Sequence, residues 1–93
     1  MENKWFHEDK WIIKSKYVRK VEFWIVQGIV SQDFYVLDGQ PTGTYKFEIG
    51  ITGFGTTYRG WKLTGIKSWQ EAQEIMERIL YVIADNVLTN LGC

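Results

Sequence analysis

Aromatic residues and helix-forming residues are segregated along this chain, and that split constrains its fold more than any other feature. All but two of the aromatic residues, Trp69 and Tyr81, lie before Lys67, in segments where apolar and polar residues alternate. Alternation with a period of two is typical of strands that bury one side. After Lys67 the apolar positions recur every three to four residues, which is typical of an amphipathic helix. The sequence therefore predicts strands first and one helix last.

The length of the chain sets the size of the fold. Ninety-three residues leave room for one hydrophobic core, so residues 1–93 are predicted to be a single domain. We assign residues 1–9 to a lead-in, 10–67 to strands and 68–91 to the helix. Strands and helix each have one apolar side to bury. We therefore predict an α+β fold, with an antiparallel sheet of four or five strands followed by one long C-terminal helix packed on one face.

Five segments carry a strand signal, and turn residues separate most of them. The segments are residues 10–18, 21–30, 34–37, 45–51 and 57–66. Residues 21–30 have apolar side chains on both sides, so we predict one central strand there. Arg19-Lys20 is predicted to form the preceding connection, and one long bent strand through these residues is the alternative. Asp38-Gly39 predicts a turn or loop after the third segment.

The helix begins with a recognisable signal. Ser68 stands three residues before Glu71, the spacing of a capping box in which each side chain satisfies a backbone amide of the first turn. The periodicity predicts a helix that runs to about Asn90. On its polar side, Tyr81 and Leu88 lie seven residues apart and so on one line. We expect them to be able to form a contact with a second copy of the chain or with another protein.

Residues suited to catalysis or to binding a metal are scarce. His7 and Cys93 are the only imidazole and thiol, and they stand at opposite ends of the chain. Asp33 and Asp38 are interpreted as residues that flank a turn, with no further acidic ligands around them. Glu22 and Glu48 are expected to face Lys16, Lys46 or Lys62 as cross-strand charge pairs rather than to act as a pair of catalytic acids. We predict no enzymatic activity, no cofactor and no metal site.

Charge is unevenly distributed although its sum is zero. Residues 10–67 carry nine Lys and Arg against four Asp and Glu, whereas residues 68–93 carry Arg78 against four acids. The N-terminal residues show no signal-peptide pattern, and no apolar run is long enough to span a membrane. A cytoplasmic protein without a membrane contact is the expectation.

Aromatic and basic side chains alternate within the predicted strands, which is typical of a recognition surface. The candidate contact residues are Lys14, Lys16, Trp24, Tyr35, Arg59, Trp61 and Lys62, together with Tyr81 and Leu88 on the helix. Tyr58 belongs to the same predicted sheet face. Exposed rings beside cations can stack on bases while the cations meet phosphates. The same residue types also dominate contacts between proteins.

Two functional hypotheses follow. The first is a small non-enzymatic protein-binding module, such as an inhibitor, an adaptor or a regulatory subunit, encoded by a phage or another mobile element. It would use the aromatic and basic sheet face or the back of the helix. The alternative is a single-stranded nucleic-acid-binding protein with a stacking platform on the open sheet face. The two differ in salt dependence, since binding to phosphates weakens steeply as salt rises.

Overall fold

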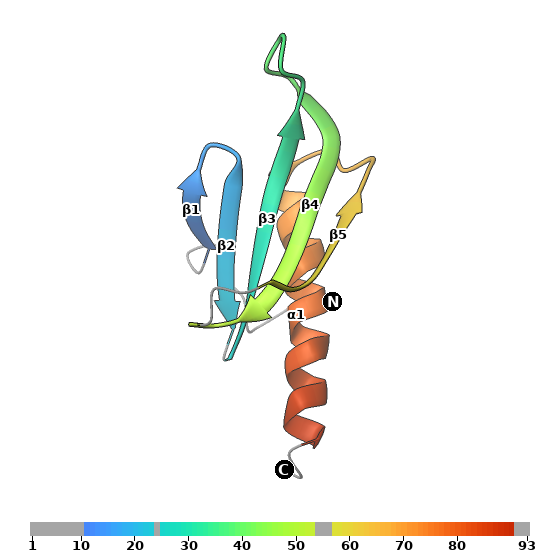
Figure 1. Ribbon diagram of the computed structural model, residues 1–93. Coiled ribbons are helices and arrows are strands. Elements are labelled where there is room, and N and C mark those ends of the chain that lie inside the picture. Colours follow the sequence, from blue (N-terminus) through green and yellow to red (C-terminus); the bar gives the residue numbers. More distant parts are fainter. Residues whose placement is uncertain (1–10, 24, 54–56, 91–93) are drawn as a thin grey trace.

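The structure is a five-stranded antiparallel sheet with one helix laid across one of its sides (Figure 1). The computed structural model describes residues 11–23, 25–53 and 57–90, without the side chains of residues 57, 58, 84 and 87–90. The strands are β1 (Trp11–Ser15), β2 (Val18–Phe23), β3 (Val26–Phe34), β4 (Pro41–Ile51) and β5 (Thr57–Leu63), and the helix is α1 (Trp69–Asn90). The predicted α+β class, with strands first and one C-terminal helix on one face, is confirmed.

The strands form a simple meander in the order β1-β2-β3-β4-β5, each antiparallel to the next. The longest strand, β4, corresponds to the clearest alternation in the sequence, where Tyr45, Phe47 and Ile49 are buried and Lys46 is exposed. Because side chains alternate across a strand, this pattern gives β4 one side for the core and one for the exterior.

The predicted central strand over residues 21–30 is wrong. Its first half belongs to β2 and its second half to β3, and the pairing of Phe23 with Val26 shows that the chain reverses between them. Arg19 and Lys20, predicted to form a connection, instead lie inside β2. The predicted third strand over residues 34–37 is also wrong, because β3 ends at Phe34 and the chain then enters a loop.

Each side of the sheet is defined by rows of directly opposed residues. The rows that face α1 include Trp11-Val21-Gly28-Ile49-Arg59 and Ile13-Arg19-Val30-Phe47-Trp61. The rows on the opposite side, called the outer side here, include Ile12-Lys20-Ile29-Glu48-Gly60 and Val18-Ser31-Lys46-Lys62. The first pair of rows is mostly apolar and the second pair is mostly polar, as expected for a sheet with one covered side.

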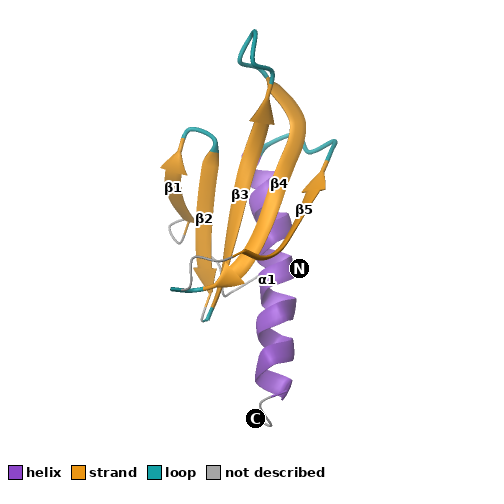
Figure 2. Ribbon diagram, viewed as in Figure 1, coloured by secondary structure: helices purple, strands orange, loops and turns teal. Residues whose placement is uncertain are grey.

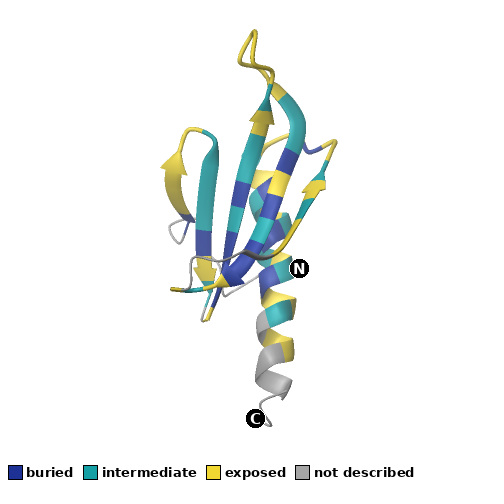
Figure 3. Cartoon of the chain, in the orientation of Figure 1, coloured by how far each residue is buried: buried dark blue, intermediate teal, exposed yellow. Residues whose placement is uncertain are grey.

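The core lies between α1 and the middle of the sheet, as the dark blue residues in Figure 3 show. Its fully buried side chains are Phe47, Met76, Leu80, Val21 and Val30. Gly28 allows the helix to approach β3 closely, since a Cβ at that position would stand only 2.5 Å from the sulfur of Met76. The missing side chain of one strand residue therefore sets the distance between the two layers.

The helix begins as the capping box predicts. Glu71 N donates to Ser68 Oγ at 3.2 Å, while the carboxylate of Glu71 accepts from Lys67 N at 3.0 Å rather than from the amide of Ser68. From there α1 runs behind the sheet and projects past its lower end (Figure 2). Among the residues described, no helix is both long enough and apolar enough to cross a membrane.

Candidate binding surfaces

The β3–β4 hairpin projects beyond the rest of the sheet, and its end is a well-defined turn (Figure 2). The hairpin tip, residues 35–40, is closed by hydrogen bonds from Tyr35 N to Gln40 O and from Gly39 N to Tyr35 O, both 2.8 Å long. Gln40 N also donates to Asp38 Oδ1 at 3.0 Å. Gly39 has a φ of 70°, which a residue with a side chain rarely adopts. The backbone of the tip is thus held in one conformation.

The hairpin tip presents three consecutive apolar side chains to the exterior. Tyr35 is 57% exposed, Val36 is 90% exposed and Leu37 is 101% exposed. A single exposed apolar residue is ordinary, but a run of three at a projecting turn is typical of a contact surface. Tyr35 is among the contact residues predicted from the sequence, whereas Val36 and Leu37 are not, because both were predicted to lie in a strand.

The base of the hairpin is aromatic and its flanks are acidic. Tyr17, in the turn between β1 and β2, stacks on Phe34 at the end of β3 with ring centroids 4.1 Å apart. Asp33 and Asp38 are both exposed, and no Lys or Arg occurs between Ser31 and Tyr45. Thr42 Oγ1 lies 3.4 Å from the carboxylate of Asp33. The hairpin tip is therefore an apolar point with negative charge beside it.

The residues predicted to form one platform do not share a sheet face. Trp61 lies opposite Phe47 on the side that faces α1, and the two rings stack with centroids 5.6 Å apart. Arg59 lies opposite the buried Ile49 and so belongs to the same side. Trp61 therefore fills the space beside the core rather than offering a ring on the outer side. The positions of Trp61 and Arg59 correct the sequence-based interpretation.

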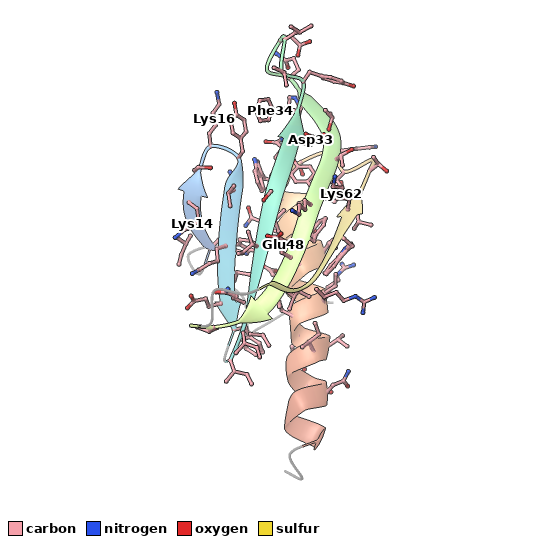
Figure 4. All side chains as sticks on the ribbon, viewed as in Figure 1. Lys14, Lys16, Asp33, Phe34, Glu48 and Lys62 are labelled. Atoms are coloured by element: carbon pink, nitrogen blue, oxygen red, sulfur yellow. The ribbon has the colours of Figure 1, made fainter. Side chains whose placement is uncertain are left out.

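The outer side of the sheet carries paired charges; Figure 4 labels two of its charged residues, Glu48 and Lys62. Lys46 forms an ion pair with Glu48 at 3.1 Å, and Lys20 forms one with Glu22 at 3.0 Å. Lys62 lies opposite Lys46 on β5. Glu48 thus pairs with one of the three predicted lysines, whereas the partner of Glu22 is Lys20, which was not predicted. The prediction of cross-strand pairs is wrong, because each lysine comes from the same strand as its acid. These pairs neutralise much of the charge that a phosphate backbone would need.

The other predicted contact residues are dispersed. Lys14 is exposed on β1, and Lys16 lies in the following turn with its ammonium 5.6 Å from the ring centroid of Tyr17. Tyr81 is 37% exposed on α1. Trp24 falls outside the described residues, as do the side chains of Tyr58 and Leu88. The predicted line of contact on the helix therefore stays a prediction.

A polar cluster lies between the start of α1 and the sheet. Trp69 meets Tyr45 edge-on with centroids 5.1 Å apart, and Gln32 Nε2 donates to the hydroxyl of Tyr45 at 3.0 Å. Burial raises the pKa of Tyr45, because a phenolate is poorly solvated there; the neighbouring Arg19 acts in the opposite direction. The cluster has the contacts of a structural junction between helix and sheet.

Neither a metal centre nor a similar known protein indicates an activity. In the described part of the chain, no three residues of the His, Cys, Asp and Glu types lie close enough to hold a metal ion. Comparison with protein-family models, curated proteins and solved structures found no match. The chain's own surfaces are therefore the guide to its function, and the hairpin tip is the most distinctive of them.

Proposed function

We propose that this chain is a small non-enzymatic protein-binding module, an inhibitor, adaptor or regulatory subunit, that docks through its hairpin tip. One observation supports this proposal above the others. Val36 and Leu37, 90% and 101% exposed, stand at the end of a hairpin whose backbone is fixed by hydrogen bonds. Two apolar side chains kept in water at a projecting point are best explained by a partner that buries them.

The energetics of such a contact are favourable. Burying an aliphatic side chain of this size contributes roughly 1.5–3 kcal/mol. A turn that its own hydrogen bonds order before binding avoids much of the entropic cost of ordering a loop. Tyr35 adds an exposed ring beside the two aliphatic side chains, and tyrosine is enriched among the residues that dominate protein interfaces. A pocket in the partner would therefore receive the apolar side chains of a turn that is already ordered.

The charge beside the hairpin tip favours a protein over a nucleic acid or an anionic membrane. Asp33 and Asp38 would bring negative charge towards phosphate groups, which costs free energy instead of gaining it. An apolar pocket in a protein, bordered by Lys or Arg, would accept both the side chains and the acids. The main contact is therefore placed at the hairpin tip and not on the sheet face, where the sequence predicted it.

The test compares three forms of the full chain as bait in lysate from its source organism. The first is the unchanged chain, and the second carries Val36→Ser with Leu37→Ser. The third is a matched control that carries Ile51→Ser with Val82→Ser, two side chains that are 41% and 55% exposed elsewhere on the surface. Each lysate is used with and without nuclease, and circular dichroism verifies the fold of each bait.

We expect the unchanged chain and the control to retain the same specific protein, also in the presence of nuclease. The hairpin variant should retain at least about tenfold less, which corresponds to one strong contact residue. Equal retention by the hairpin variant would overturn the role of the hairpin tip. Nucleic acid that co-purifies with all three forms, together with proteins that nuclease releases, would instead support the single-stranded nucleic-acid alternative.

A further inference from the structure

The edge strand β1 is a second surface with features of a binding site, separate from the hairpin tip. Within the described residues, which begin at Trp11, β1 pairs with β2 only and is the edge of the sheet, and an edge strand can pair with a further strand through its backbone groups. Ile12 and Ile13 are 47% and 69% exposed, and they point to opposite sides of the sheet. An edge strand with an exposed isoleucine on each side offers apolar contact to a strand added there.

The charge of this edge is strongly one-sided. Between Trp11 and Val21 the chain carries Lys14, Lys16, Arg19 and Lys20 and no acid. Lys20 is paired with Glu22, and Arg19 is held by Gln73 and Trp69. Lys14 takes part in no ion pair among the described residues. The ammonium of Lys16 lies over the ring of Tyr17. Figure 4 shows Lys14 and Lys16 at the outer margin of the sheet.

These two lysines decide which kind of strand the edge can accept. A second copy of the chain would bring its own Lys14 and Lys16 to the same seam, and like charges across a strand pair are destabilising. Lysines on an edge commonly prevent sheets from joining in this way. The same charges attract a strand that carries acids, since each Lys then gains a partner of opposite charge.

We infer that β1 binds an extended acidic segment of another protein as a sixth strand of the sheet. The segment would place apolar side chains beside Ile12 and Ile13 and carboxylates beside Lys14 and Lys16. Two adjacent apolar residues followed by acidic residues satisfy both requirements, because neighbouring side chains in a strand point to opposite sides, as Ile12 and Ile13 do, and Lys14 comes next along the edge. The backbone hydrogen bonds supply affinity, and the side chains select the sequence.

Two synthetic peptides of equal length test this inference on the full chain. One repeats two valines followed by two glutamates and the other repeats two valines followed by two lysines, and both are capped at each end. Binding is followed by amide chemical shifts in ¹⁵N–¹H spectra. The peptide concentration is raised to about 1 mM, which is high enough to detect a weak contact with a dissociation constant in the millimolar range. The acidic peptide should shift the amides of β1, the lysine peptide should not, and salt should weaken the binding.

Variants of equal net charge locate the interaction. Lys14→Glu with Lys16→Glu should weaken binding of the acidic peptide at least fivefold and allow the lysine peptide to bind. The matched control, Lys62→Glu with Lys67→Glu, changes two exposed lysines away from the β1 edge and should bind as the unchanged chain does. Absence of shifts in β1, equal binding of both peptides, or equal loss in the control would overturn the inference. The hairpin variant should bind the acidic peptide normally, so this result is separate from the test of the hairpin tip.

Discussion

Arg19 lies over the indole of Trp69, with its guanidinium carbon 4.3 Å from the ring centroid. Its Nη1 also donates to Gln73 Oε1, one turn further along α1. One β2 side chain therefore contacts two successive turns of the helix. The contact forms close to where the helix begins, so it ties the start of α1 to the sheet.

The first prediction concerns this contact. Arg19→Ala should lower the free energy of unfolding by about 2 kcal/mol, because it removes a cation–π contact and a hydrogen bond from a charged donor. The measurement is urea unfolding followed by the tryptophan fluorescence. Lys20→Ala is the matched control, since it removes only the surface ion pair with Glu22 and should cost less than about 1 kcal/mol. Equal losses in the two variants would contradict the proposed role of Arg19.

Gly28 gives the second prediction. Its Cβ would stand 2.5 Å from Met76 Sδ and 2.6 Å from Met76 Cγ, with Leu80 Cδ1 at 3.0 Å behind them. Met76 and Leu80 are fully buried, so neither can move aside easily. Gly28→Ala should therefore destabilise the protein by about 1–3 kcal/mol through overpacking.

Two further variants separate overpacking at Gly28 from a general effect of alanine in a strand. Gly60→Ala on β5 is the control, because the nearest atom to its Cβ would be a backbone oxygen at 3.4 Å. It should cost less than Gly28→Ala. Met76→Ala should make the Gly28→Ala change less harmful than it is alone, since it removes the clashing atoms. Additive losses in the double variant would show that the contact does not limit the helix–sheet distance.

The fold class followed from the sequence because its two signals are long and local. Alternation in β4 and the capping box at Ser68 each depend on residues close together in the chain. The reversal between Phe23 and Val26 was missed because no Gly, Pro, Asn or Asp stands between them to mark a turn. The apolar residues of two strands were consequently assigned to one.

The candidate contact surface was harder to predict, since exposure depends on the whole fold. Val36 and Leu37 have the composition of a strand, and only the pairing of Phe34 with Pro41 places them beyond the end of the sheet. Trp61 was assigned to the wrong side because the direction of a strand side chain changes with a shift of one residue in register. Its position opposite Phe47 became visible only with the pairing of β4 and β5.

The third prediction concerns the start of the helix. Ser68→Ala should destabilise the protein by about 1 kcal/mol, because Glu71 N loses the side-chain acceptor that satisfies it. Thermal unfolding followed by circular dichroism at 222 nm measures the effect. Thr64→Ala, an exposed change before the helix, is the matched control and should leave the midpoint nearly unchanged. If Thr64→Ala lowered the unfolding midpoint as much as Ser68→Ala does, the Ser68 cap would not contribute specifically to stability.

The fourth prediction follows from Tyr45, which is only 2% exposed and whose pKa is raised by burial. An unfolded tyrosine ionises near pH 10, whereas the buried one keeps its proton to higher pH. Above about pH 10 the unfolded state therefore binds fewer protons than the folded state, and stability should fall as pH rises. Below that pH both states keep the proton, so the group causes no change with pH.

Tyr45→Phe tests this linkage because it removes the ionising group and keeps the ring. The variant should lose some stability at pH 8, since Gln32 Nε2 loses its acceptor, at a cost of about 1 kcal/mol. Between pH 10 and 11 its free energy of unfolding should fall less steeply than that of the unchanged chain. Urea unfolding at each pH gives both quantities. Parallel curves for the two proteins across that range would show that the hydroxyl of Tyr45 ionises equally well in the folded and unfolded states.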